Sequence, residues 1–260
     1  MILYGKPFAQ RVEREVARRA AKMHAKPVLA IVLVGSDPAS LSYVKRKGQA
    51  AESLGCGFLL RHLTNGVSEA RVILLLKKLN KDKKVRGIIV QLPLPKKFNT
   101  ERVLSAIAPQ KDIDNLRGDS PFLSPSVQAI WHLLTKTGVP KKSAPILIIG
   151  YGRLIGKPLH AFLVKKGFTN IDVADKKTEN LNARILAADV VISATGQPSL
   201  VKRVKRGAVV IDAGAGIQNG KIKGDVDIAR VAKFAKVVAP VPGGVGPLTV
   251  AYLFKNLISA

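Results

Sequence analysis

The chain of 260 residues has little cysteine, few aromatic residues and few acidic residues. Its single cysteine, Cys56, excludes an internal disulfide and fits a reducing compartment. Aromatic residues make up only 5%, and neither zinc-finger spacing nor an RNA-binding aromatic motif is present. The apolar runs are of strand length, which is too short for a membrane span, and "MILYGKPFAQ" lacks the features of a signal peptide. We therefore expect a cytoplasmic protein with no membrane partner.

Acidic residues are the most conspicuous shortage. The chain has 17 Asp and Glu against 43 Lys and Arg, so its formal charge is +26. Such a charge is typical of proteins that meet nucleic acid or other anions. The basic residues are, however, spread over several stretches that resemble the polar faces of amphipathic helices. The charge predicts non-specific polyanion binding, but does not by itself make this a nucleic-acid protein.

What the chain does have is regular alternation of apolar strand-like runs with helical patterns, over a hydrophobic content of 47%. Such alternation predicts an α/β protein built from βαβ units, with mostly parallel sheets covered by helices. At this length we expect two domains, and the turn-rich segment 111–126 is a plausible crossing between them. The expected strands are 28–34, 57–62, 87–92, 145–149, 170–174, 189–194, 208–212 and 236–239; the expected helices are 7–24, 38–55, 68–80, 100–108, 125–137, 154–166, 178–187 and 246–258.

A helix is expected to begin within "DPASLSYVKRKGQA", directly after a buried strand. Asp37 suits the N-cap and Pro38 the first helical position. Helical spacing then places Ser40, Tyr43 and Lys47 on one face, at the carboxyl end of a strand where ligands bind in α/β sheets. The pattern alone favours the interpretation of Lys47 as a solvated surface lysine, because the chain has 43 Lys and Arg.

The second half contains a glycine-rich turn between an expected strand and helix, in "ILIIGYGRLIGKPL". Gly150, Gly152 and Gly156 form a variant of the dinucleotide fingerprint, in which backbone amides approach a pyrophosphate at a helix N-terminus. Asp175 ends the next strand at a suitable distance to bind the adenosine ribose. The alternative for Asp175 is a turn residue that caps the helix from Thr178.

Two further loops have the composition of a binding site. Gln91 ends a strand before the prolines of "QLPLP". In "PVPGGVGPLTV", Gly243 and Gly244 carry no side chains that would keep a flat ligand from the backbone. Gln91 could equally be a hydrogen-bonded residue at the edge of a sheet.

Taken together, these segments resemble the methylenetetrahydrofolate dehydrogenase/cyclohydrolase family over nearly the whole chain. The matches include "SYVKRKGQAAESLG", "GIIVQLPLP", "PQKDIDN", "ADVVISATGQP", "GDVD" and "PVPGGVGPLTVAYL". The combination of the Tyr43–Lys47 segment, "QLPLP" and "PVPGGVGP" is the most specific. The resemblance implies oxidation of 5,10-methylenetetrahydrofolate with NAD or NADP, then hydrolysis to 10-formyltetrahydrofolate. It also implies a homodimer, and a cleft between a parallel-sheet folate domain (1–118 plus 241–260) and a Rossmann-type NAD(P)-binding domain (119–240).

The same resemblance assigns roles to individual residues. It implies that Tyr43 stacks on the folate, Lys47 transfers protons in the hydrolytic step, Gln91 orients Lys47 and Asp114 holds the pterin. Further substrate contacts would come from Ser40, Pro242, Gly243 and Gly244. The implied cofactor-binding residues are Gly150, Tyr151, Gly152, Arg153, Leu154, Gly156, Asp175, Lys176, Lys177, Thr195 and Gly196.

Several positions depart from the family pattern. Asn115 stands where glycine is usual, and Leu123 to Val127 replace a Cys-Thr-Pro-x-Gly run. Tyr151 and Gly152 replace Arg-Ser, and Asp175 replaces a frequent histidine, which together favour NAD over NADP. Lys176 and Lys177 favour NADP, because lysine pairs with phosphate.

Two other functions are compatible with the sequence. One is a dehydrogenase without the hydrolytic step, which the joint presence of Tyr43, Lys47 and Gln91 disfavours. The other is a non-catalytic relative that binds polyanions such as RNA through its charge. The four histidines have no metal-ligand spacing, so we expect no metal; Cys56 and Asp212 are interpreted as structural residues.

Overall fold

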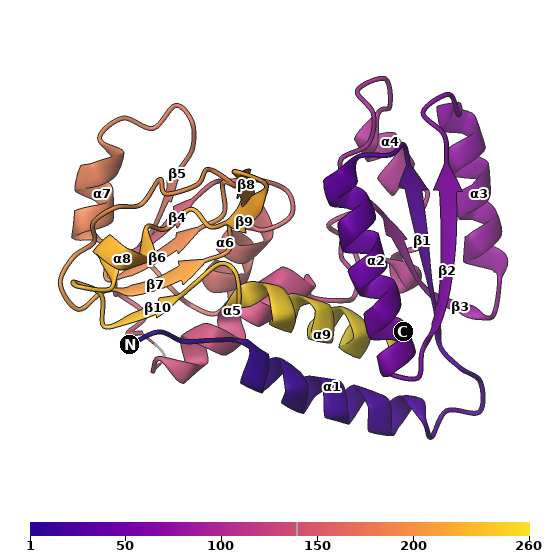
Figure 1. Cartoon of the computed structure of the whole chain (residues 1–260), viewed down its shortest axis with the longest axis horizontal. Helices are drawn as coiled ribbons and strands as arrows, with labels where there is room; N and C mark the ends of the chain where they lie inside the picture. The colour runs from indigo at the N-terminus through magenta and orange to yellow at the C-terminus, as the bar shows by residue number, and fades with distance from the viewer. Residues whose placement is uncertain (139) are drawn as a thin grey trace. The chain divides into compact units, whose positions relative to one another are not determined.

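The computed structural model describes residues 1–138 and 140–260, and the chain divides into two compact units. One consists of Gln10–Ser124 and Val250–Ala260, and the other of Met1–Ala9 and Pro125–Thr249. We call them the N-terminal and the C-terminal unit after their longer segments. The α/β class, with a parallel sheet in each unit, confirms the prediction (Figure 1).

The N-terminal unit is built on a three-stranded parallel sheet of order β2-β1-β3. Residues 29–34 of the central strand β1 are all buried, because helices cover this apolar run as they do in other parallel sheets. Helices α2 and α3 pack against the strands (Figure 1). The elements are β1 (Val28–Val34), α2 (Pro38–Ser53), β2 (Gly57–Leu63), α3 (Glu69–Lys81), β3 (Val85–Val90), α4 (Thr100–Leu104) and the 3₁₀ helix η1 (Pro109–Lys111).

The C-terminal unit is built on a five-stranded parallel sheet of order β10-β7-β6-β4-β5. Its strands are short and apolar, and Leu147, Val191 and Val210 form part of one buried cluster. The elements are α5 (Pro125–Lys136), β4 (Ile146–Ile149), α6 (Gly156–Lys165), β5 (Ile171–Ala174), α7 (Leu181–Ala187), β6 (Val190–Ser193), β7 (Val209–Asp212), β8 (Gly216–Gln218), β9 (Lys221–Lys223), α8 (Ile228–Val231) and β10 (Val237–Ala239).

Two helices, α1 (Lys6–Ala20) and α9 (Val245–Leu257), each contain one of the points at which the chain passes between the units. Residues before Ala9 belong to the C-terminal unit because Ile2 bridges Val238 and the Gly5 amide donates to the Gly243 carbonyl at 2.8 Å. In the N-terminal unit, the buried Asn256 of α9 donates to the carbonyls of Ile113 and Leu123. The domain boundaries 118/119 and 240/241 stay a prediction.

All eight expected strands and eight expected helices have counterparts in the structure, with ends that differ by a few residues. The helices expected over 7–24 and 100–108 are shorter, and the one expected from Thr178 begins at Leu181. The sequence prediction missed the β8-β9 hairpin and α8. The hairpin turns through Asn219 and Gly220, both with positive φ, so the Asn-Gly pair between apolar-polar alternations was an available signal.

No helix in the described part of the chain is both long and apolar enough to cross a membrane.

A glycine in β3 is required by packing. A Cβ on Gly87 would lie 2.6 Å from Ile113 Cδ1 and 2.8 Å from Leu257 Cδ1, both on fully buried side chains. We therefore expect Gly87→Ala to lower the free energy of unfolding by about 1–3 kcal/mol, the usual cost of overpacking a core. The measurement is urea unfolding of both proteins.

Gly66→Ala is the matched control, because a Cβ there has only Thr64 Oγ1 nearby, at 3.8 Å. It should change stability by less than about 0.5 kcal/mol, as surface substitutions generally do. Equal stability of the two variants would contradict this account of the β3 core.

Candidate functional site

Helix α2 begins where the sequence predicted. The Asp37 carboxylate accepts the Ser40 amide at 2.8 Å, and Pro38 occupies the first turn. This cap fixes the helix directly after β1 and so sets the position of the face that carries Ser40, Tyr43 and Lys47. Ser40 is buried, Lys47 is half-buried and Tyr43 is 40% exposed, with the Arg46 guanidinium 4.5 Å from its ring centre.

Gln91 follows β3 and meets Lys47 in space. The Lys47 ammonium donates to Gln91 Oε1 at 3.2 Å, and Gln91 Nε2 donates to the Leu92 carbonyl at 2.8 Å. The second bond fixes the amide with its oxygen toward the lysine. The backbone N–H of Gln91 also donates to the Val32 carbonyl of β1 at 2.9 Å, so the ends of β1 and β3 are held together. This is the point between β1 and β3 where the strand order reverses, the usual ligand position in open α/β sheets.

Asp114 is the third residue of this cluster and, after Lys47, its second charged group. Burial lowers the pKa of Lys47, and the negative charge of Asp114 opposes that shift. Burial likewise raises the pKa of Asp114, and the positive charge of Lys47 opposes it. Each residue thus stabilises the charged form of the other in a place from which water is partly excluded. We call Lys47, Gln91 and Asp114 the lysine cluster.

The departure at Asn115 has a structural explanation. Its φ is +53°, a left-handed conformation that glycine adopts freely and asparagine tolerates better than most residues. The Asn115 side chain accepts the Ser120 amide at 3.3 Å. Asparagine therefore retains the backbone turn beside Asp114.

The glycine-rich turn lies in the C-terminal unit, between β4 and α6. Gly150 has a φ of +96°, and a Cβ there would lie 2.6 Å from the Ala194 carbonyl oxygen. A Cβ on Gly156 would overlap the carbonyl oxygen of Gly150. Gly152 has open space around it, so neither packing nor φ requires glycine there.

This turn fits a dinucleotide. Helix α6 has ten residues and its N-cap, Ile155, makes no side-chain cap bond, so an anion can accept from the first backbone amides. The strand order reverses between β4 and β6, and Thr195 and Gly196 follow β6 at that point. Beside the turn, Tyr151 packs edge-on to His160 and Leu154 is 49% exposed, while Arg153 is half-buried.

Asp175 forms a turn and stays accessible. Its Oδ1 accepts the Lys177 amide at 2.8 Å and the Thr178 hydroxyl at 3.3 Å. The residue is exposed at the end of β5, as are Lys176 and Lys177. The local turn that the sequence offered as an alternative is therefore present, and Asp175 Oδ2 has no hydrogen bond to any residue that the structure describes.

The predicted substrate loop Pro242–Gly244 lies in the C-terminal unit, apart in the chain from the lysine cluster. Gly243 has a φ of +106°, and its carbonyl accepts the Gly5 amide. A Cβ on Gly5 would overlap the Gly244 carbonyl oxygen. These glycines therefore contact the N-terminal segment of the chain itself, while Pro242 is exposed.

The sequence analysis did not identify Ser193 and Asp225 as site residues. Asp225 Oδ2 accepts the Thr195 amide at 2.7 Å, the Thr195 hydroxyl at 2.8 Å and the Ser193 hydroxyl at 2.7 Å. These contacts join residues about thirty positions apart in sequence, so only the "GDVD" match could have drawn attention to Asp225.

Comparison with known proteins identifies the family. Residues 3–114 match the model for the catalytic domain of tetrahydrofolate dehydrogenase/cyclohydrolase, and residues 124–260 match its NAD(P)-binding domain. The bifunctional protein FolD of Geotalea daltonii is 38% identical, over 100% of this chain and 98% of its own length. That of Aquifex aeolicus is 37% identical, over 100% and 94%.

Solved structures agree with this assignment. The bifunctional enzyme FolD, a methylenetetrahydrofolate dehydrogenase/cyclohydrolase from Campylobacter jejuni, superposes with a TM-score of 0.93 at 32% identity, covering 100% of this chain and 97% of the other. The Trypanosoma brucei enzyme, complexed with NADP cofactor and an inhibitor, gives 0.92 at 30% identity, covering 100% and 96%. With both family models matched in order along it, the chain belongs to the tetrahydrofolate dehydrogenase/cyclohydrolase family.

Proposed function

We propose that this chain oxidises 5,10-methylenetetrahydrofolate with NAD(P) and hydrolyses the resulting 5,10-methenyltetrahydrofolate to 10-formyltetrahydrofolate. The lysine cluster is the observation that carries the proposal, since it brings Lys47, Gln91 and Asp114 together at a strand-order reversal. Family membership and the dinucleotide-like turn support the oxidative half.

Lys47 is the proton-transfer group of the hydrolytic step. A lysine must lose its proton to act as a base, and burial favours the neutral amine. A cationic methenyl substrate nearby would favour the neutral amine further. Gln91 holds the Nζ atom in place, because its own amide is fixed by Leu92.

Asp114 and Tyr43 bind the substrate. A partly buried carboxylate can accept hydrogen bonds from the N–H groups of a pterin, and the exposed Tyr43 ring can stack on the aromatic part of a folate. Ser40, Pro242, Gly243 and Gly244 are further proposed substrate contacts.

The oxidative step requires alignment rather than a base. Bound NAD(P) supplies the hydride acceptor. Gly150 and Gly156 allow the backbone to approach the pyrophosphate, while Tyr151, Gly152, Arg153, Leu154, Thr195 and Gly196 complete the proposed site. Lys47 therefore contributes less to oxidation than to hydrolysis.

Replacing Lys47 by methionine should separate the two activities. We expect Lys47→Met to lower hydrolysis of added 5,10-methenyltetrahydrofolate by at least about 100-fold, the usual contribution of a general acid-base. Oxidation should fall less, so methenyl product should accumulate in the variant. The measurement is absorbance at the methenyl band, corrected for reduced nicotinamide.

Lys45→Met is the matched control, because Lys45 is exposed on another face of the same helix. It should leave both activities close to those of the wild type. Equal loss of oxidation and hydrolysis in Lys47→Met would contradict a role for Lys47 in hydrolysis, and absence of both activities in folded wild type would refute the proposed function.

We further propose a preference for NAD over NADP. The free oxygen of Asp175 can accept from a ribose hydroxyl, and its negative charge would repel the extra phosphate of NADP. Lys176 and Lys177 are exposed and have no side-chain partner within residues 1–138 and 140–260, and their positive charges reduce that repulsion.

Asp175→Asn should weaken the preference for NAD, because it removes the negative charge that repels the extra phosphate of NADP. We expect the ratio of kcat/KM for NAD to that for NADP to fall by about tenfold, as for one lost charge-assisted contact. Asp172→Asn is the control, because Asp172 is also exposed on β5 but pairs with Arg184 at 2.9 Å. Faster turnover of the wild type with NADP would contradict the proposed preference.

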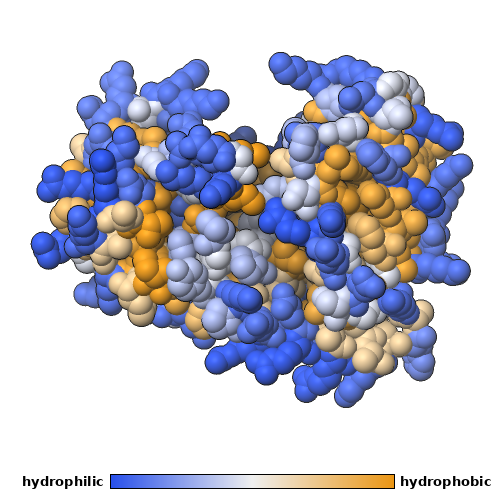
Figure 2. Space-filling view, viewed as in Figure 1, coloured by the Kyte–Doolittle hydropathy of each residue, from blue (hydrophilic) through white to orange (hydrophobic). Residues whose placement is uncertain are grey.

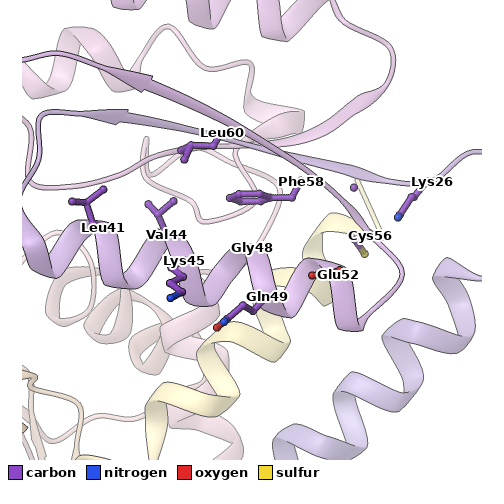
Figure 3. Close-up of a pocket in the computed structure, with 11 residues that line it drawn as sticks. Lys26, Leu41, Val44, Lys45, Gly48, Gln49, Glu52, Cys56, Phe58 and Leu60 are labelled. Carbon is purple, nitrogen blue, oxygen red and sulfur yellow. The ribbon is translucent and has the colours of Figure 1, made fainter.

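We also propose a homodimer formed through β2 and α2. β2 is an edge strand and none of its residues is buried, although strands of parallel sheets are usually covered. Figure 3 shows Leu41 and Val44 of α2 facing Phe58 and Leu60 of β2 along an apolar groove. Figure 2 shows an apolar surface in this region bordered by hydrophilic side chains. A second copy can cover the same patch symmetrically, as in other twofold dimers.

Leu60→Lys should therefore convert a dimer into a monomer, because it places a charge in that patch. The molar mass is measured by light scattering during size-exclusion chromatography. Leu186→Lys, an equally exposed leucine in the C-terminal unit, should leave the mass unchanged. A monomeric wild type at micromolar concentration would contradict the proposal.

Polyanion binding is proposed only as a non-specific property of the charge. The N-terminal unit has 23 Lys and Arg against 10 Asp and Glu, and the C-terminal unit has 20 against 7, so each carries +13. An even distribution is typical of a general electrostatic field rather than of one nucleic-acid site.

A further inference from the structure

Two carboxylates in the C-terminal unit are buried without a cation. Asp212 ends β7 and Asp225 follows β9, and neither side chain has any exposed surface. None of the ion pairs in residues 1–138 and 140–260 includes either residue. Because an unpaired buried charge is costly, these carboxylates must be stabilised by hydrogen bonds.

Backbone amides satisfy Asp212. Its carboxylate accepts from Gly214 at 3.1 Å, from Asp225 at 3.2 Å and from Val226 at 2.9 Å. A Cβ on Gly224 would overlap Asp212 Oδ2, and one on Gly214 would overlap the Asp225 carboxyl group. Asp212 therefore fixes the backbone of the segment that presents Asp225.

Asp225 in turn fixes the end of β6. Its Oδ2 receives all three bonds from Ser193 and Thr195, whereas its buried Oδ1 has no hydrogen-bond partner among the described residues. Thr195 lies against the glycine-rich turn, since a Cβ on Gly150 would be 3.1 Å from Thr195 Cγ2. The Ala194 amide also donates to the Ile149 carbonyl of β4 at 2.8 Å.

We infer that Asp225 is a positioning residue for dinucleotide binding, which holds the Thr195–Gly196 loop against Gly150 through its bonds to Thr195 and Ser193. This inference depends on the proposed function, because it takes that loop and turn as the NAD(P) site. Asp225 acts through Thr195, and Asp212 acts through the backbone that carries Asp225.

The pair also makes binding sensitive to pH. Burial, reinforced by the negative charge of Asp225, raises the pKa of Asp212 to about 7. Within residues 1–138 and 140–260, Asp225 is the only charged side chain that shifts the pKa of Asp212; the other groups that shift it are backbone amides. As pH rises through about 7, Asp212 gains a negative charge in the segment that holds the proposed dinucleotide loop. Dinucleotide affinity should therefore fall as pH rises through about 7.

The free energy of unfolding should also fall as pH rises. The folded pKa of Asp212 lies above the value of 3.8 in an unfolded chain, so the folded state binds the proton more tightly. The contribution of Asp212 to stability is complete below pH 3.8 and is lost as pH rises to about 7. Asp212→Asn, which cannot ionise, should remove this pH dependence of both stability and dinucleotide affinity.

The experiment titrates full-length wild type, Asp225→Asn and Asp227→Asn with NAD and with NADP by calorimetry. We expect Asp225→Asn to weaken binding of the preferred dinucleotide about tenfold, because its bonds to Thr195 lose the negative charge. In turnover, KM for the dinucleotide should rise while KM for the folate substrate stays within twofold.

Asp227→Asn is the control for a purely structural effect. Asp227 caps α8 two residues further along, accepting the Arg230 amide at 3.2 Å, so this variant also tests a loss of local stability. Its dinucleotide affinity should match that of the wild type. Unchanged affinity in Asp225→Asn, or a loss that Asp227→Asn shares at an equal drop in Tm, would overturn the inference alone. A wild type that binds neither dinucleotide would overturn the proposed function and the inference with it.

Discussion

Parallel pairing brings the carboxyl ends of all strands in a sheet to one edge. In both larger sheets of this chain, the candidate site residues lie at that edge. In the N-terminal unit the central strand β1 leads into α2 and its neighbour β3 leads into Gln91, so lysine and amide come together although 44 residues separate them. In the C-terminal unit, β4 leads into the glycine-rich turn and β6 into Thr195. The chemistry in each unit depends on this arrangement of strand ends.

The lysine cluster illustrates how charge and burial are balanced in such a place. Burial lowers the pKa of Lys47 because it disfavours the charged ammonium, and the negative charge of Asp114 limits that decrease. Since Asp114 is also the proposed pterin ligand, bound substrate would alter the field that Lys47 experiences.

Local patterns in the sequence predicted the strands and most helices, whereas the family resemblance implied the residues of the lysine cluster. Asp37 and Pro38 set the start of α2, the helix that carries Lys47, so the position of that helix is a local property. The role of Asp225 could not be predicted in this way. Its partners Ser193 and Thr195 are 32 and 30 residues away, and nothing in the surrounding pattern indicates which of several aspartates becomes buried.

The paths of α1 and α9 mean that neither unit is one continuous piece of chain. Met1–Ala9 complete the unit that otherwise contains Pro125–Thr249, and Val250–Ala260 complete the unit that otherwise contains Gln10–Ser124. A cut between Ser124 and Pro125 would therefore give two fragments, each of which lacks a segment held by the other. During synthesis, the N-terminal unit obtains its segment Val250–Ala260 only after all of Pro125–Thr249 has been made. The folding of the two units is thus coupled through Met1–Ala9 and Val250–Ala260.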